Sequence, residues 1–294
     1  GVDFKNQLSA TSELNILTYL YYYNGAGVAV ADFDNDGWED VYFVSNQGQN
    51  KLYLNQRNIK FKENTPEILK QNEGWSTGVS IVDINADGLK DIYLCKIGDY
   101  NGIKGRNMLF VNKGADANGK LVFEEEAENY NLDIISFATQ SSFFDYDLDG
   151  DLDMYLLNHS VHPNRTYGRG SKRTVEDSLS GDRLYRNDNG IFTDVSQQTG
   201  IYQGAIGYGL GVLTTDINND GFPDIYVAND FFENDYLYIN NQDGTFNEII
   251  SSDQNTVGHT SHYSMGVDIE DLNNDGLNDI FSLDMLPENL STFK

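Results

Sequence analysis

A nine-residue acidic segment recurs five times along the chain, and this repeat constrains the fold more than any other feature. The pattern is Asp-x-Asp/Asn-x-Asp-Gly-x-x-Asp, and its copies begin at Asp32, Asp83, Asp145, Asp216 and Asp271, roughly 50 to 70 residues apart. A short run rich in Val, Ile, Tyr and Phe precedes each copy, and a similar run follows it. Such runs, bounded by turn residues, are typical of β-strands. Each acidic loop is therefore expected to connect two strands.

Two further strand-like runs follow in each of the first four repeats. The third runs are residues 51–55, 108–112, 183–187 and 236–240, and each ends in Asn. The fourth runs open on a phenylalanine, at Phe61, Phe123, Phe192 and Phe246. Four strands in every repeat of about this length are typical of a propeller blade. The sequence therefore predicts an all-β fold, a β-propeller of four-stranded antiparallel blades.

The repeats also predict the domain organisation. The blade repeats span about residues 24–66, 75–128, 137–197, 208–250 and 263–294, and the last contains only two strands. Residues 1–7 are expected to act as a closing strand, because Phe4-Lys5-Asn6 resembles the fourth-strand segment that begins at Phe61. Because the fifth repeat stops after two strands, either the chain is a fragment or its final blade is built from both ends. We favour one propeller domain over residues 1–294 that is a fragment of a larger ring, of about seven blades, with further domains of the same polypeptide as partners.

The spacing of the acidic residues predicts calcium sites. Calcium takes six to eight oxygen ligands, largely carboxylates and carbonyls. Positions one, three, five and nine supply side-chain oxygens, position six is a turn-forming glycine, and position seven offers a backbone carbonyl. About five Ca²⁺ ions are expected. The predicted ligands are Asp32, Asp34, Asp36, Trp38 and Asp40; Asp83, Asn85, Asp87, Leu89 and Asp91; Asp145, Asp147, Asp149, Asp151 and Asp153; Asp216, Asn218, Asp220, Phe222 and Asp224; and Asp271, Asn273, Asp275, Leu277 and Asp279.

Other readings of these loops are less consistent with the pattern. A single Asp-Gly segment is often only a hairpin turn, but five copies share the same ninth-position Asp. An EF-hand loop requires Glu at position twelve and flanking helices. Position twelve here is Phe43, Leu94, Leu156, Val227 and Ser282. Several carboxylates within nine residues repel one another unless a cation joins them, so calcium should stabilise the fold.

The composition excludes several other classes of protein. The formal net charge of -27 argues against binding to nucleic acids or anionic membranes, which requires basic surfaces. Aromatic residues make up 13% of the chain, which is more than disordered acidic segments carry. No apolar run approaches the roughly 18 residues of a membrane span. The single cysteine, Cys95, lies in an apolar run and is interpreted as a buried hydrophobic residue.

The repeats resemble the FG-GAP/VCBS family, which includes the integrin α-subunit propeller. The likeness covers nearly the whole chain. The stretch from Ser264 to Gly276, followed by Asp284-Met285-Leu286-Pro287-Glu288, is similar to bacterial secreted or surface proteins of the cartilage acidic protein type, which often carry an ASPIC/UnbV module. The resemblance implies a seven-bladed propeller, extracellular calcium and a role in adhesion or ligand binding. It implies an extracellular or cell-surface location and does not identify a ligand.

A ligand is expected on the propeller face opposite the acidic loops. The longest insertion, residues 159–182, carries a basic group in an acidic protein and is interpreted either as a solvated loop or as a site for an anionic ligand. Aromatic residues at the starts of first strands either pack between blades or form a carbohydrate platform. The candidates are Arg165, Tyr167, Arg169, Lys172 and Arg173 in the insertion, and Trp75, Tyr208 and Tyr263 at the strand starts. Two His-x-x-His pairs, at His159 and His259, are interpreted as loop hydrogen-bonding groups or a transition-metal site.

Three functional hypotheses follow from these features. The first is a non-enzymatic extracellular module that binds a glycan or protein ligand. The second is a polysaccharide lyase or hydrolase on a propeller scaffold, with His159 or Tyr167 as a base; no nucleophile elbow or zinc-protease motif is present. The third is a structural segment of a large surface protein. We favour the binding module and expect no catalytic residues.

Overall fold

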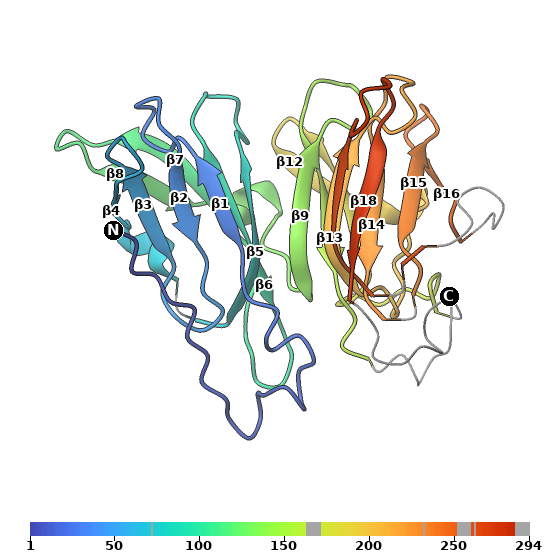
Figure 1. The fold of residues 1–294 in the computed structure, drawn as a ribbon, viewed down its shortest axis with the longest axis horizontal. Helices are drawn as coiled ribbons and strands as arrows, with labels where there is room; N and C mark the ends of the chain where they lie inside the picture. The colour runs from blue at the N-terminus through green and yellow to red at the C-terminus, as the bar shows by residue number, and fades with distance from the viewer. Residues whose placement is uncertain (72, 163–171, 232, 252–259, 262, 286–294) are drawn as a thin grey trace. The chain divides into compact units, whose positions relative to one another are not determined.

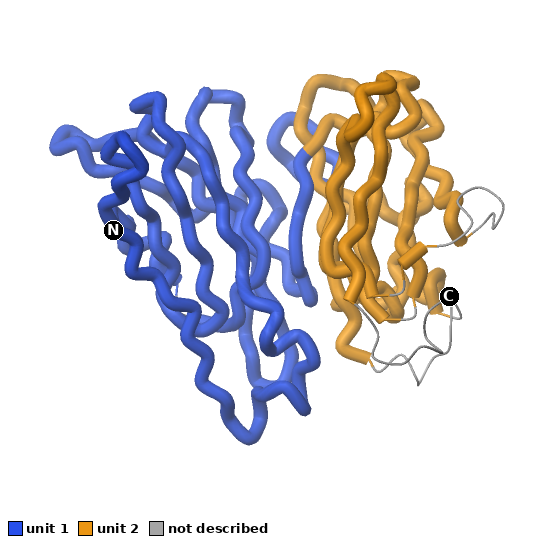
Figure 2. Tube along the Cα trace, viewed as in Figure 1, with its two compact units in different colours: residues 1–143, 186–193 blue, residues 144–185, 194–294 orange. Residues whose placement is uncertain are grey.

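The computed structural model describes residues 1–71, 73–162, 172–231, 233–251, 260–261 and 263–285 (Figure 1). These residues form almost entirely β-structure. One four-residue α-helix, α1 (Ser196–Thr199), and two short 3-10 helices, η1 (Glu67–Lys70) and η2 (Ala127–Tyr130), lie in connections between sheets. The chain divides into two compact units, residues 1–143 with 186–193 and residues 144–185 with 194–294 (Figure 2).

Four of the five repeats form four-stranded sheets in which strands that follow one another in sequence are neighbours. The register is antiparallel in the first, second and fourth sheets and between β10 and β11 of the third. The predicted all-β fold of four-stranded blades is confirmed. The strands of the four sheets are β1 (Val28–Ala31), β2 (Asp40–Phe43), β3 (Lys51–Asn55) and β4 (Phe61–Glu63); β5 (Trp75–Val82), β6 (Asp91–Ile97), β7 (Met108–Ala115) and β8 (Leu121–Glu125); β9 (Ala138–Phe144), β10 (Asp153–Asn158), β11 (Arg183–Asp188) and β12 (Ile191–Asp194); and β13 (Gly209–Thr215), β14 (Asp224–Asn229), β15 (Tyr236–Asn240) and β16 (Phe246–Glu248).

The fifth repeat has two strands in the described part of the chain, β17 (Ser264–Glu270) and β18 (Asp279–Asp284), which pair in an antiparallel register. Apolar side chains of β18 remain exposed, including Phe281 at 53% and Leu283 at 57%. In the complete sheets, the corresponding second strands are largely buried because third strands and neighbouring sheets cover them. Within the described residues, β18 has hydrogen-bonded strand neighbours on one edge alone.

The apolar faces of adjacent sheets pack against each other within each unit. In unit 1, Tyr42 and Leu52 of the first sheet join Ile92 and Phe110 of the second in one buried cluster. In unit 2, residues of β10 and of the fourth sheet belong to an equivalent cluster, which includes Tyr155 and Tyr238. The packing of one sheet on the next is therefore the source of the core, as expected for stacked repeats that cannot bury both faces alone.

The N-terminal segment lies against the first sheet. Phe4 stacks on Phe43 of β2 with ring centroids 5.0 Å apart. The Asn6 side chain donates to the Asn46 side chain at 2.7 Å and accepts a hydrogen bond from the Asn46 backbone amide at 3.1 Å. These residues have no strand assignment, so the closing strand expected at residues 1–7 stays a prediction.

In each of the four-stranded sheets, a buried tyrosine on the second strand is hydrogen-bonded to an Asn or Asp that immediately precedes the third strand. The pairs are Tyr42–Asn50 at 2.9 Å, Tyr93–Asn107 at 3.0 Å, Tyr155–Asp182 at 2.9 Å and Tyr226–Asp235 at 2.8 Å. With Asn, the side-chain amide donates to the tyrosine oxygen, and the tyrosine hydroxyl donates to a backbone carbonyl. With Asp, the tyrosine hydroxyl donates to the carboxylate. Unit 2 therefore buries two carboxyl groups where unit 1 buries neutral amides.

These two carboxyl groups should make the stability of the protein depend on pH. Burial raises the pKa of Asp182 to about 7 and the pKa of Asp235 to about 6, from an ordinary value of 3.8. The folded state then binds more protons than the unfolded state, so both groups lower stability as pH rises from about 4 to about 7. We expect Asp182→Asn and Asp235→Asn to raise the melting temperature above that of wild type, and to do so more at about pH 8 than at about pH 5. The measurement is thermal unfolding at constant calcium. The matched control is Glu128→Gln, at an exposed position. The expectation would be contradicted if the melting temperatures of the two Asp variants changed with pH in parallel with that of wild type.

Candidate metal centres

All five acidic loops adopt the same backbone conformation. The residue at position four is left-handed in every loop, with φ between 55° and 60° at Asn35, Ala86, Leu148, Asn219 and Asn274. The glycine at position six is also left-handed, with φ between 85° and 98°. For Ala86 and Leu148 this region costs roughly 1–2 kcal/mol. The loop geometry is therefore imposed by its hydrogen bonds and is not a local preference of these two residues.

Side-chain oxygens inside each loop accept hydrogen bonds from the loop's own backbone. In the first loop, the Asp32 carboxylate accepts from the amides of Asp36 at 3.1 Å and Gly37 at 2.7 Å. Asp36 in turn accepts from the Trp38 amide at 3.0 Å. The other four loops repeat these three bonds. The backbone thus orients the carboxylates at positions one and five in the same way five times.

Carboxylate oxygens lie close together in two of the loops. In the first and third loops, where position three is Asp, one carboxylate oxygen from each of positions one, three and five lies within 4.8 Å of the other two. Burial, and next the charge of Asp36, raise the pKa of Asp34. Hard cations such as Ca²⁺ prefer oxygen ligands of this kind. The donor chemistry of positions one, three, five and nine therefore fits a calcium ion.

The Asp at position nine is held differently from the other acidic residues. Asp91 is fully buried, accepts from the Ile84 amide at 2.9 Å, and accepts from the Asn112 amide at 2.7 Å through its other oxygen. Asp40 and Asp224 form the equivalent pairs of bonds. Burial raises the pKa of Asp40 and of Asp91 to about 6. The ninth residue therefore joins the acidic loop to the third strand of its sheet.

This arrangement predicts that position nine contributes to stability without metal. Asp91→Ala removes the acceptor of two buried backbone amides, each of which costs about 1–3 kcal/mol when unpaired. We expect the free energy of unfolding in EDTA to fall by about 2–4 kcal/mol, measured by urea denaturation. Asp87→Ala, at the exposed fifth position of the same loop, is the control and should change it little in EDTA. Equal losses in both variants would contradict this assignment.

The apolar residue at position two packs beneath the loop in the first three repeats. Phe33, Ile84 and Tyr146 are buried, and Ile217 is partly buried. Leu272 in the fifth loop is 64% exposed. Leu272 lacks this packing because, in the described residues, no sheet follows the fifth one.

The aromatic residues proposed to contact a ligand are largely covered. Trp75 is 1% exposed and packs against Tyr19 and Tyr22. Tyr208 is 2% exposed, and its hydroxyl donates to the His162 carbonyl at 2.9 Å. Tyr263 is half-buried. At Trp75 and Tyr208 the structure thus shows packing, the alternative interpretation of these positions.

The described part of the basic insertion is engaged in internal contacts. Arg165, Tyr167 and Arg169 lie outside the described residues. The Arg173 guanidinium pairs with Glu233, whose side chain is 2% exposed and accepts a second bond from the Tyr236 hydroxyl at 3.1 Å. The charge of Arg173 is therefore compensated within the fold. Lys172 is partly buried.

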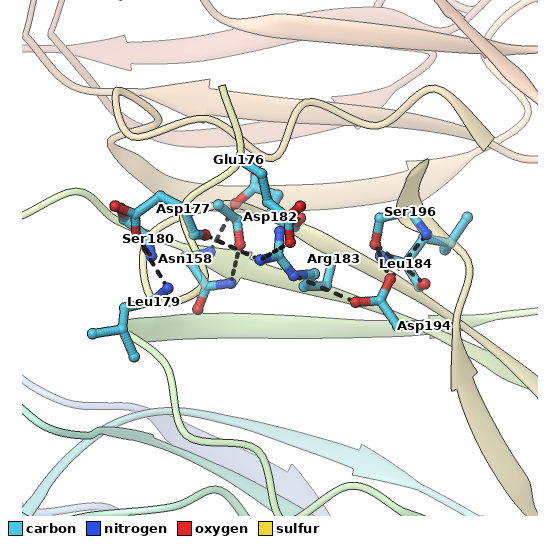
Figure 3. Close-up of polar contacts among 11 residues, drawn as sticks. Asn158, Glu176, Asp177, Leu179, Ser180, Asp182, Arg183, Leu184, Asp194 and Ser196 are labelled. Carbon is cyan, nitrogen blue, oxygen red and sulfur yellow. Dashed lines mark hydrogen bonds and ion pairs between the residues drawn. The ribbon is translucent and has the colours of Figure 1, made fainter. Parts of the chain in front are cut away.

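A polar network anchors the C-terminal end of the insertion (Figure 3). The Asp182 carboxylate accepts from the Asn158 amide at 2.8 Å, and Arg183 lies 3.4 Å from Asp194. Sequence reasoning did not identify Asp182 or Asp235, although both occupy the position of Asn50 and Asn107 immediately before the third strand. Aligning the repeats on their third strands would have revealed them.

Two of the four histidines, His159 and His162, lie in the described residues. His159 is buried, and burial lowers its pKa to about 4, so it is neutral. His162 lies 3.5 Å from Asp177. His259 and His262 are outside the described residues, so a metal site shared by the two pairs stays a prediction.

The acidic loops correspond to a known repeat. The model of the FG-GAP-like repeat family matches residues 32–94, 174–227 and 216–282. This chain belongs to the FG-GAP-like repeat family. Each matched segment runs from one sheet into the next, and together the segments include complete acidic loops at Asp32, Asp83, Asp216 and Asp271.

Two curated relatives carry the same name. Cartilage acidic protein 1 of Xenopus tropicalis is 28% identical over 269 residues, and that of Homo sapiens is 27% identical over 270 residues. Each alignment covers 86% of this chain, which spans 39% and 38% of the relatives' lengths.

A solved structure of an Agrocybe aegerita lectin, described by its recognition of non-reducing terminal N-acetylglucosamine, covers 87% of this chain and 73% of its own. It has 17% identity and a TM-score of 0.39, and a likeness at this level is not evidence for a shared ligand. Separately, no helix in the described ranges has the length and apolar character needed to cross a bilayer.

Proposed function

We propose that this FG-GAP-like chain is an extracellular calcium-binding β-propeller module that presents a surface for a glycan or protein ligand. The observation that supports calcium most directly is the fivefold repetition of one loop geometry with the same oxygen donors. Positions one, three, five and nine supply side-chain oxygens, and position seven supplies a carbonyl. Bound cations would also offset part of the net charge of -27.

An extracellular site is consistent with the kind of affinity such loops need. Calcium modules outside the cell work with dissociation constants on the order of 10⁻⁴–10⁻³ M. The loops contain three to five carboxylates each, are partly exposed and are held by backbone hydrogen bonds. This charge and rigidity suit binding at extracellular calcium concentrations.

Calcium should stabilise the folded protein. At ten times the dissociation constant, one site contributes about 1.4 kcal/mol, so five sites contribute several kcal/mol. We expect calcium to raise the melting temperature by at least about 10 °C over EDTA, and calorimetric titration to count about five ions. Magnesium is the control and should act more weakly, because it prefers rigid octahedral sites. A melting temperature unaffected by EDTA would contradict calcium binding.

The ligand surface is proposed on the basic insertion, because it concentrates positive charge in an acidic protein. Arg173 is paired with Glu233. The residues proposed to contact an anionic glycan or a carboxylate-bearing peptide are Arg165, Arg169, Lys172 and Tyr167, chosen for their charge and their place in the insertion. Tyr263 is the least buried of the three strand-start aromatics. The ligand class rests on charge, and neither curated relative's name specifies a ligand.

A glycan and peptide array probed with the calcium-loaded protein tests this surface. We expect binding of acidic ligands that falls at least tenfold in Arg165→Ala/Arg169→Ala, because charge-assisted hydrogen bonds contribute about 1.5–3 kcal/mol each. The matched control is Lys60→Ala/Lys62→Ala, which removes two exposed charges elsewhere. Equal binding by both double variants would reject the basic insertion as the site, and release of unsaturated sugars would instead indicate a lyase.

A further inference from the structure

One asparagine in unit 1 contacts two neighbouring acidic loops. Asn112, on β7, donates its backbone amide to the ninth-position Asp91 at 2.7 Å and its side-chain amide to the Lys90 carbonyl at 3.3 Å, both in the second loop. The same side-chain nitrogen donates to the Phe33 carbonyl of the first loop at 3.0 Å. Asn112 is completely buried, and its bonds to Asp91 and to the Phe33 carbonyl are shielded from water.

Asn240 occupies the same position in unit 2. It donates its backbone amide to Asp224 at 2.9 Å and its side-chain amide to the Pro223 carbonyl at 3.2 Å, both in the fourth loop. Its side chain also donates to the Tyr146 carbonyl of the third loop at 2.8 Å. The second-position carbonyl of one loop is thus tied to the eighth and ninth positions of the next loop in both units.

Asn55 provides an internal comparison. It donates to Asp40 at 2.8 Å and to the Glu39 carbonyl at 3.0 Å, which are the equivalent bonds within its own repeat. Its side-chain oxygen accepts from the Arg57 amide, as that of Asn112 accepts from the Gly114 amide. Among the described residues, however, Asn55 donates to no second acidic loop.

The hydrogen bonds of Asn112 reach residues that flank the predicted metal ligands. The Phe33 carbonyl belongs to the same planar peptide as the amide of Asp34, a predicted ligand, so fixing that carbonyl fixes the peptide that carries Asp34. At the other end, Asn112 holds the carboxylate of Asp91. Ordering either loop therefore pre-orients the other, which is the requirement for positive coupling between two sites.

Further contacts extend this link in unit 2. The Asn278 side chain in the fifth loop donates to the Asp216 carbonyl in the fourth at 2.9 Å. Asn219 in the fourth loop donates to the Gly276 carbonyl in the fifth at 3.3 Å. The third, fourth and fifth loops are thus connected in series.

We propose that the third-strand asparagines Asn112 and Asn240 couple calcium binding between neighbouring loops, so that occupation of one loop raises the affinity of the next. The proposal rests on the calcium function proposed above. It makes these asparagines positioning residues, since neither is a metal ligand. A coupling through one hydrogen bond corresponds to about 2- to 12-fold in affinity.

The first loop contains its own reporter. Trp38, at position seven, is one of two tryptophans, and the other, Trp75, begins the eight-residue strand that leads to the second loop. The length of that strand places Trp75 about 25 Å from the second loop. Terbium replaces calcium at oxygen sites and luminesces when a nearby indole is excited. Emission sensitised by tryptophan therefore reports the first loop, and loss of the signal in Trp38→Phe confirms its origin.

The experiment titrates terbium, with calcium competition, while the second loop is disabled by Asp87→Ala. In a protein that retains Asn112, we expect Asp87→Ala to weaken terbium binding at the first loop about 2- to 12-fold. In Asn112→Ala, the same change should have less than about a twofold effect. Asn55→Ala and Asn240→Ala are matched controls, and both should retain the wild-type response.

Two results overturn the coupling: no effect of Asp87→Ala on the first loop in wild type, or an undiminished effect in Asn112→Ala. If Asn112→Ala does not fold, as judged by its melting temperature in calcium, the test keeps all asparagines unchanged and compares two disabled loops. Asp87→Ala in the second loop must then weaken terbium binding at the first loop more than Asp275→Ala in the fifth loop does. Equal effects of the two substitutions overturn the proposal. Absence of sensitised emission from wild type contradicts calcium binding itself, whereas normal binding without coupling contradicts only this inference.

Discussion

The buried carboxylate at the ninth position of the first four acidic loops is the interaction on which the sheets and the candidate sites both depend. Asp40, Asp91 and Asp224 each accept one amide from the start of their loop and another from the third strand. The bond closes the loop and aligns the second and third strands together. Because the same carboxylate is also a predicted metal ligand, the sheet and the proposed calcium site share one residue. Strand pairing and metal binding are therefore difficult to separate in this fold.

The strands and loops could be predicted from the sequence because their signals are local. The acidic pattern and the flanking Val, Ile, Tyr and Phe runs lie within about a dozen residues of each other, and they located all five repeats. The asparagines that end the third strands were recognised as well, but only as strand ends. Their bridging role depends on partners 79 residues away for Asn112 and 94 residues away for Asn240, and no local pattern contains that information.

The candidate ligand surface was harder to predict for a related reason. Arg173 is 60 residues from Glu233 in sequence, and its pairing with that buried carboxylate became evident only in the folded chain. Similarly, Trp75 was assigned to a strand start correctly, but Tyr19 and Tyr22 from a separate segment cover it. Composition identifies an unusual group of residues. It does not reveal which of these residues are already paired with, or covered by, other residues of the protein.

The incomplete pairing of the fifth sheet has a practical consequence. A strand that leaves its outer backbone groups unpaired is a template for another strand, particularly when apolar side chains flank it. In the described residues, β18 has this character, with Phe281 and Leu283 exposed beside its open edge. Within the described residues, β18 therefore offers backbone donors and acceptors to a further strand, and lysine or proline substitutions on its outer edge would weaken such pairing.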